Sequence, residues 1–137
     1  MERPPEVVLD THAWVWWVGQ TAQLSARASR LIDQAREART LFVSSISAWE
    51  VAMLTARNRL TLTMPVRDWV AHSEALPFLQ FVPVTNAIAI TAVELPRPKT
   101  PEDPADRLII ATALSLGARL ITRDKRITAC RVVATVW

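Results

Sequence analysis

The chain has 137 residues, of which 50% are hydrophobic and 21% charged, so we expect one folded domain over residues 1–137 and exclude a disordered chain. The net charge of +3 is too small to predict a nucleic-acid partner on its own. No apolar run is long enough to span a membrane, no signal-peptide pattern follows the first residues, and the single cysteine, Cys130, has no partner for an internal disulfide. These features predict a cytoplasmic protein without a membrane partner.

Short apolar runs alternate with segments of helical periodicity along the chain. In chain order they predict strand 6–9, helix 11–18, helix 25–39, strand 41–43, helix 45–58, helix 66–76, strand 81–84, helix 86–94 with Asn86 as its cap, helix 105–116, strand 118–121 and strand 132–134. Residues 95–104 hold four prolines and are expected to form a loop. In the strands, successive residues are all apolar and do not alternate with polar ones. The pattern therefore predicts an α/β fold with a short parallel sheet covered by helices on both faces.

Four acidic residues stand where solvent is not expected. Asp10 directly follows strand 6–9, and Asp124 follows strand 118–121, so both belong to the carboxyl ends of strands, where such folds bind ligands. Glu50 and Asp106 are spaced by three and four residues from apolar residues of their helices, which places them on inward faces. A carboxylate in an apolar stripe is expensive to bury without a partner. We therefore expect the four acids to converge in one cleft.

Each acid also has a simpler interpretation. Asp10 could cap the helix that follows it, and Asp124 could be a turn residue. Asp106 could belong to a capping arrangement with Asp103, while Glu50 could pair with a buried arginine. These alternatives stay open for single residues, but they do not explain why all four acids are placed toward the same edge of the sheet.

A cluster of carboxylates predicts a bound cation. Carboxylates that share a cleft repel one another and resist ionising together, and a divalent cation removes that conflict. Oxygen ligands without cysteines or a histidine pair favour Mg²⁺ or Mn²⁺ over Zn²⁺. Such an ion activates a water molecule and stabilises charge on a phosphodiester, so the cluster indicates phosphoryl chemistry.

Four segments, in order and together spanning almost the whole chain, carry a family resemblance. They are Val8-Leu9-Asp10-Thr11-His12 with Trp16 or Trp17, Ser44-Ser45-Ile46-Ser47-Ala48-Trp49-Glu50-Val51-Ala52, Asp103-Pro104-Ala105-Asp106-Arg107-Leu108-Ile109-Ile110-Ala111-Thr112-Ala113 and Leu120-Ile121-Thr122-Arg123-Asp124. The chain resembles PIN-domain ribonucleases of the VapC type, which are toxins of toxin–antitoxin pairs. It departs from the common pattern at Leu54, Asn58, Pro101-Glu102 and Ala105, and none of these departures removes an acid.

The resemblance implies a PIN-like three-layer α/β/α fold and cleavage of single-stranded or structured RNA. It implies a Mg²⁺ or Mn²⁺ site, for which we expect Asp10, Asp106 and Asp124 as direct ligands and Glu50 as the fourth catalytic acid, ligating or holding a metal-bound water. It also implies a small antitoxin that blocks the site, and a homodimer.

Several further residues are candidates for contacts. Arg123 and Arg126 flank Asp124 and are candidate phosphate contacts, with a solvated basic face as the alternative. Arg107 could pair with a carboxylate or lie at the surface. Thr11 and Thr122 could hydrogen-bond the carboxylates, and they could equally be plain turn or cap residues. A separate expectation concerns an apolar partner surface, which should include one or more of Trp14, Trp16, Trp17 and Trp69.

The sequence leaves three other functions to weigh. One is a non-catalytic RNA-binding or regulatory module, against which the presence of all four acids argues. A DNA-directed nuclease of the same fold is the enzymatic alternative, and a phospho-accepting receiver domain lacks the paired acids it would need near the first strand. His12 and His72 are the only histidines and do not form a general-base pair, so we expect attack by an activated water rather than by the ribose 2′-hydroxyl.

Overall fold

The computed structural model describes residues 3–137 and contains a five-stranded parallel sheet with the strand order β3-β2-β1-β4-β5. The strands are β1 (Val7–Leu9), β2 (Leu41–Ser44), β3 (Leu79–Val82), β4 (Arg119–Ile121) and β5 (Thr135–Val136). Because the first strand lies in the centre, with β2 on one side and β4 on the other, the chain changes direction at β1. Crevices at such a position, beyond the carboxyl ends of the strands, are the usual ligand sites of these folds.

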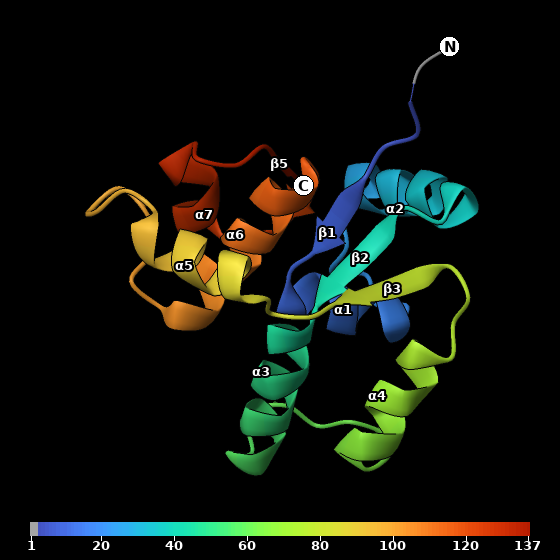
Figure 1. Ribbon diagram of the computed structural model, residues 1–137. Coiled ribbons are helices and arrows are strands. Elements are labelled where there is room, and N and C mark those ends of the chain that lie inside the picture. Colours follow the sequence, from blue (N-terminus) through green and yellow to red (C-terminus); the bar gives the residue numbers. More distant parts are fainter. Residues whose placement is uncertain (1–2) are drawn as a thin grey trace.

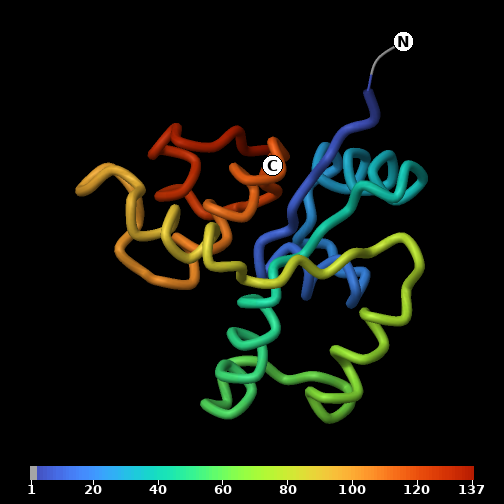
Figure 2. Tube along the Cα trace, in the orientation of Figure 1, coloured from blue at the N-terminus to red at the C-terminus, as the bar shows by residue number. Residues whose placement is uncertain are grey.

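Seven helices surround the sheet within the described residues (Figure 1). They are α1 (Thr11–Val18), α2 (Ala26–Ala38), α3 (Ser45–Ala56), α4 (Val66–Glu74), α5 (Asn86–Glu94), α6 (Pro104–Leu116) and α7 (Lys125–Cys130). In both views of the backbone, α5, α6 and α7 lie on one side of the sheet and α2 on the other, while α3 and α4 extend beyond it (Figure 2). This arrangement confirms the expected α/β fold with three layers. None of the helices among residues 3–137 has the length and apolar character required to cross a membrane.

Successive residues of the central strand face two separate cores. Val7 and Leu9 pack with Trp14 of α1 and Ile32 of α2, whereas Val8 packs against α6, including Ile110. All six side chains are inaccessible to solvent. Because strand side chains alternate between faces, a sheet covered on both sides needs apolar residues at every position, as the run Val7–Leu9 provides.

The two edge strands lie elsewhere than the sequence indicates. Strand β3 covers 79–82 rather than 81–84, because buried Leu79 pairs with Leu41 of β2 while Val84 is exposed beyond the strand. Strand β5 covers 135–136 rather than 132–134, because Val136 pairs with Ile121 of β4. The position of an edge strand is set by the neighbour whose backbone it must match in register.

Two details of the helices also differ from expectation. The cap of α5 is Thr85 and not Asn86, since the Thr85 hydroxyl accepts a hydrogen bond of 3.2 Å from the Ile88 amide. Helix α7 was not expected at all, and it begins directly after Asp124. It buries Ile127 and Cys130 against the rest of the fold, so its short sequence is stabilised by packing rather than by length.

Candidate metal and phosphodiester site

Asp10 and Asp124 lie close to the same edge of the sheet because they follow adjacent strands. Asp10 comes directly after β1, and its backbone amide donates a 3.0 Å hydrogen bond to the carbonyl of Ile121 at the end of β4. Its Oδ1 accepts from the Ala13 amide at 2.8 Å and thereby caps α1. Asp124 caps α7 in the same way, with Oδ1 accepting from the Arg126 amide at 2.8 Å. The capping interpretation of Asp10 is therefore correct, and each carboxylate keeps its second oxygen for other contacts.

Glu50 reaches the same edge from α3 and is held there by α1. Its Oε1 lies 2.5 Å from the Thr11 hydroxyl, which is also 2.9 Å from the Ser47 hydroxyl. Because a threonine hydroxyl carries one proton, Thr11 donates to Glu50 and accepts from Ser47. Thr11 and Ser47 are buried, so this chain of hydroxyls fixes the direction of the Glu50 carboxylate. Ser47 lies one helical turn before Glu50, a spacing from which its role could have been predicted.

Asp106 enters the site from the first turn of α6. The helix starts at Pro104, and the Asp103 carboxylate caps it by accepting from the Asp106 amide at 3.3 Å. The sequence indicated Asp103 as part of this cap but not as a lining residue of the site. Its spacing of three from Asp106 was the available signal, because residues three apart lie on the same side of a helix.

These elements enclose one pocket of about 620 Å³. Its lining includes all four acids expected from the sequence together with both candidate phosphate contacts: Asp10, Glu50, Asp106, Asp124, Arg123 and Arg126. Asp103, Thr11, His12, Trp16, Ile109 and Lys125 complete it. His72, by contrast, lies exposed on α4 and lines a different groove.

The comparisons with known proteins agree with this geometry. The family model described as PIN domain matches residues 7–132. This chain belongs to the PIN-domain family. It is 41% identical over 133 residues to Ribonuclease VapC22 of Mycobacterium tuberculosis, covering 96% of this chain and 98% of that protein.

Solved structures share the fold of this PIN domain at lower identity. DNA-bound VapBC from Salmonella typhimurium matches with a TM-score of 0.67 and 18% identity, covering 96% of this chain and 97% of the other. A toxin–antitoxin complex from Klebsiella pneumoniae matches with a TM-score of 0.63 and 21% identity, again covering 96% and 97%. FitAcB from Neisseria gonorrhoeae gives 0.63 and 22%, with 96% of each chain covered.

The acids of the PIN domain are crowded, and their pKa values show it. Burial, followed by the charges of Asp103, Glu50 and Asp124, raises the pKa of Asp106 to about 7. Burial also raises the pKa of Asp10 and of Glu50; hydrogen bonds from Thr122 to Asp10 and from Thr11 to Glu50 oppose that increase. Five carboxyl groups share this pocket with three basic side chains, Arg123, Lys125 and Arg126.

The residues of the pocket fit a hard divalent cation by their chemistry. All the acidic donors are oxygens, the ligands that Mg²⁺ and Mn²⁺ prefer. A positive group already lies between two of them, since the Arg126 guanidinium is 3.9 Å from Asp106 and 3.5 Å from Asp124. Among residues 3–137, no three His, Cys, Asp or Glu side chains stand close enough to hold an ion as they are. The carboxylates would therefore have to close around an ion as it binds.

Arg107 has a different role from the one expected. It is 3% exposed and forms no ion pair with a carboxylate of residues 3–137. Its guanidinium donates to five oxygens of the loop between α5 and α6 and of the end of α5: Ala92 O, Val93 O, Leu95 O, Thr100 Oγ1 and Pro101 O. The expectation of an ion pair or a surface position was wrong, because this proline-rich loop turns its carbonyls inward and needs a buried donor.

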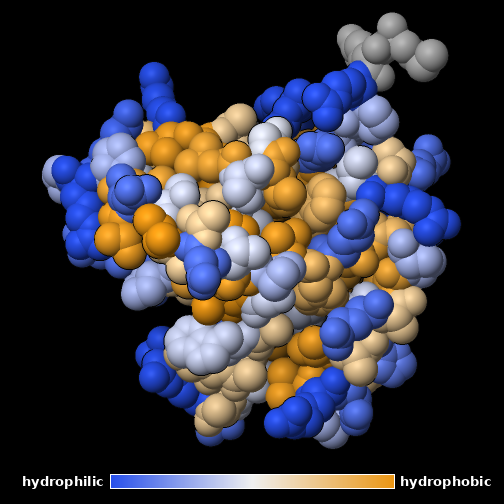
Figure 3. All heavy atoms as spheres, in the orientation of Figure 1, coloured by the Kyte–Doolittle hydropathy of each residue, from blue (hydrophilic) through white to orange (hydrophobic). Residues whose placement is uncertain are grey.

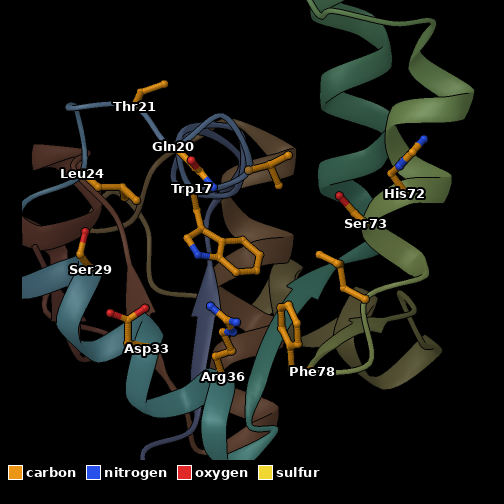
Figure 4. Close-up of a pocket in the computed structure, with 12 residues that line it drawn as sticks. Trp17, Gln20, Thr21, Leu24, Ser29, Asp33, Arg36, His72, Ser73 and Phe78 are labelled. Atoms are coloured by element: carbon orange, nitrogen blue, oxygen red, sulfur yellow. The ribbon is translucent and has the colours of Figure 1, made fainter.

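The tryptophans of α1 point in three directions. Trp14 is buried in the core, where its ring centroid lies 4.5 Å from that of Trp69 and its Nε1 donates to Ser73. Of the four tryptophans considered for a partner surface, Trp14 and Trp69 are therefore excluded by burial, and Trp16 and Trp17 remain. Trp16 lines the acid pocket. Trp17 projects into a groove between α1, α2 and α4, beside Arg36 and Phe78 (Figure 4).

Proposed function

We propose that this protein is the toxin of a toxin–antitoxin pair and that it is an endoribonuclease dependent on Mg²⁺ or Mn²⁺. The observation that carries the proposal is the pocket in which Asp10, Glu50, Asp106 and Asp124, from four separate parts of the chain, come together. The 41% identity to a protein named as a ribonuclease favours RNA as the substrate. The four acids speak against a non-cleaving module, because an RNA-binding surface gains nothing from a crowded negative pocket.

The acids of the pocket would have different roles in phosphodiester hydrolysis. Asp10, Asp106 and Asp124 would hold the ion, which when bound lowers the pKa of a water molecule and stabilises charge on the phosphate. Glu50, held by Thr11, would accept a hydrogen bond from the attacking water and orient it. The water oxygen would attack phosphorus as the bond to the 3′-oxygen breaks. The water would pass a proton to Glu50 and on to solvent, the 3′-oxygen would take one up from solvent, and the products would be a 5′-phosphate and a 3′-hydroxyl.

The basic side chains of the pocket would bind the substrate backbone. Arg123, Lys125 and Arg126 follow the end of β4 and line the pocket beside Asp124. Guanidinium groups suit the paired oxygens of a phosphate. The Arg126 guanidinium lies between Asp106 and Asp124, so an arriving ion would release it toward the negatively charged RNA.

The antitoxin and a second copy of the chain are the proposed protein partners. Trp17 lines a groove of about 610 Å³ that also includes Leu24, Leu76 and Phe78, and an apolar antitoxin segment would fit there (Figure 4). Solved relatives of this fold include a toxin–antitoxin complex. For the homodimer, the candidate contacts are exposed apolar residues of the neighbouring helices α5 and α6, namely Ile90, Val93 and Leu114. On the face shown in Figure 3, hydrophilic side chains gather along the margins and apolar ones toward the middle.

Cleavage of labelled RNA by the purified protein tests the proposed activity. We expect Mg²⁺ or Mn²⁺ to support cleavage, EDTA to abolish it, and the products to carry 5′-phosphate and 3′-hydroxyl ends. DNA of the same sequence should stay intact, and cleavage of DNA alone would favour the DNA-directed alternative. Products with 2′,3′-cyclic phosphate ends, or cleavage that ignores the chelator, would overturn both the mechanism and the assignment of the four acids.

A further inference from the structure

Part of the acid pocket is aromatic rather than charged. His12 and Trp16 both line it, and they lie one helical turn apart on the same side of α1. Their ring centroids are 5.6 Å apart with an angle of 49° between the planes. The neighbouring residues Ala13 and Trp14 face the core instead. Helix α1 therefore turns one aromatic side toward the carboxylates and the other toward the interior.

The Trp16 ring is held in position from outside the pocket. The Trp137 ring meets it edge-on, with centroids 5.7 Å apart and an angle of 63° between the planes. Trp137 itself packs against the core that contains Trp14. The Arg123 guanidinium carbon lies 5.9 Å from the Trp16 ring centroid, within the range of a cation–π contact. An aromatic ring fixed in this way loses little conformational entropy when a planar ligand stacks on it.

Trp16 packs beside His12 and Trp137 but lies outside the hydrophobic cores of the described residues. None of the hydrophobic cores within residues 3–137 includes it, although Val15, Trp17 and Val18 on the same helix all pack against one of them. Trp16 is partly exposed and faces a pocket that otherwise consists mainly of charged and polar groups. An apolar ring among polar groups in a pocket of this kind offers a stacking surface to a planar ligand.

We propose that Trp16 is a substrate-binding residue on which an unpaired nucleobase next to the scissile phosphate stacks. This inference rests on the proposed ribonuclease function. Every nucleobase has a flat π-face that stacks on an aromatic side chain, so the contact tolerates different sequences. A base inside a duplex is already stacked on both sides, and only a base in a single strand, loop or bulge is free to meet Trp16. Trp16 thus selects unpaired RNA.

Arg123 connects the base subsite with the phosphate subsite. Its guanidinium contacts the Trp16 ring and lies in the same pocket as Asp124. From this position it can reach the phosphate that joins the stacked nucleotide to its neighbour, while the base occupies the aromatic part of the pocket. Base and phosphate of one nucleotide are a short, nearly fixed distance apart. Stacking of the base on Trp16 would therefore bring the scissile phosphodiester bond to the carboxylates.

The test compares Trp16 variants on RNA with and without the base. The substrate is a short single-stranded oligoribonucleotide whose cleavage position has been mapped, together with versions that lack one base on either side of that position. Trp16→Ala should lower kcat/KM by about 5- to 150-fold, the range expected for loss of one base–aromatic stack. Trp16→Phe should keep most of the activity. Removing the stacked base should lower wild-type kcat/KM by a similar factor and should not lower that of Trp16→Ala further.

Trp49→Ala is the matched control. Trp49 is 56% exposed on α3 and does not line the acid pocket, so its loss should leave cleavage of both substrates unchanged. The comparison between substrates within one variant is independent of how much folded protein each preparation holds. If Trp16→Ala cleaves like the wild type, or still responds fully to the missing base, the stacking inference is wrong while the ribonuclease function stands.

A binding measurement separates the inference from the proposed function. In EDTA, the oligoribonucleotide carries the fluorescent base 2-aminopurine at the stacked position. Wild type and Trp49→Ala should change its fluorescence on binding, and Trp16→Ala should not. If the wild type cleaves no RNA, the proposed function fails and this measurement alone decides on stacking. An equal response from all three proteins, or loss of antitoxin binding as the single effect of Trp16→Ala, would assign Trp16 to something other than RNA.

Discussion

Asp106 and Arg107 are adjacent in the first turn of α6, and the fold surrounds their charges in opposite ways. Arg107 is buried with five hydrogen-bond acceptors around its guanidinium, all supplied by the chain. Asp106 faces Glu50, Asp103 and Asp124, and burial together with these charges raises its pKa to about 7. A charge that serves the structure is satisfied within the structure, whereas a charge that serves a reaction is left for a ligand to balance.

Replacing one acid of the pocket should have the largest effect on activity. Asp10→Asn should lower RNA cleavage on the order of a thousandfold, because an ion that contributes several kcal/mol to the transition state loses a charged ligand. The fold should remain, since asparagine also caps a helix and can accept from Ala13. Circular dichroism and a cleavage assay measure both. Asp68→Asn, at an exposed aspartate of α4, should leave both unchanged.

Retained metal-dependent cleavage by Asp10→Asn would show that Asp10 isn't a ligand. Loss of folding in the same variant would show that the charge of Asp10 stabilises the structure, as that of Arg107 does. The contrast between structural Arg107 and the acids of the pocket would then be lost.

Replacing Arg107 should have the largest effect on stability. Arg107→Ala leaves buried carbonyls without donors and a cavity, so the free energy of unfolding should fall by about 3–5 kcal/mol in urea titrations. Arg107→Lys keeps the charge but not the planar fork, and should lie between alanine and wild type. At exposed Arg30 of α2 the same change to alanine should cost less than about 0.5 kcal/mol. Equal stability of Arg107→Ala and wild type would contradict the role described for this arginine.

The smallest expected effect is a pH-dependent gain in stability for Asp106→Asn without metal. The pKa of Asp106 is raised from 3.8 to about 7 by folding, so between these values the folded protein holds a proton that the unfolded chain has lost. Stability therefore falls as pH rises through this range, and the loss is complete above the folded pKa. In EDTA the variant should be more stable than wild type by about 1–3 kcal/mol at about pH 8 and similar at about pH 4. A difference independent of pH would show that folding does not raise the pKa of Asp106.

The sequence predicts the pocket better than the loop beside it. Asp10 and Asp124 follow recognisable strands, and Glu50 and Asp106 stand at helical spacings, so local pattern and parallel topology together place all four. Arg107 is next to Asp106 and has no local pattern of its own. Its partners include carbonyls of a loop whose path depends on the packing of α5 against α6. Every residue has a backbone carbonyl, so the sequence does not show which carbonyls accept hydrogen bonds from Arg107.

The same limit explains the other differences. Helical geometry predicts that Trp14, Trp16 and Trp17 diverge, but which of them meets the core depends on how α1 is rotated against the sheet. The edge strands β3 and β5 take their places from the register of β2 and β4, and their own composition allows a shift of two or three residues.

Three acids of the pocket, Asp10, Asp103 and Asp124, also begin helices α1, α6 and α7. Each alanine substitution there would remove a charge and also a helix start worth about 1 kcal/mol, so an alanine scan would mix two quantities that asparagine keeps apart. Because these residues both cap helices and line the pocket, their retention in related proteins has two possible causes. A relative that had lost the reaction would still be held to aspartate or asparagine at these positions by the needs of folding, so their retention alone is no proof that such a relative still cuts RNA. Glu50 starts no helix, and its fate in a lineage would report on catalysis more directly.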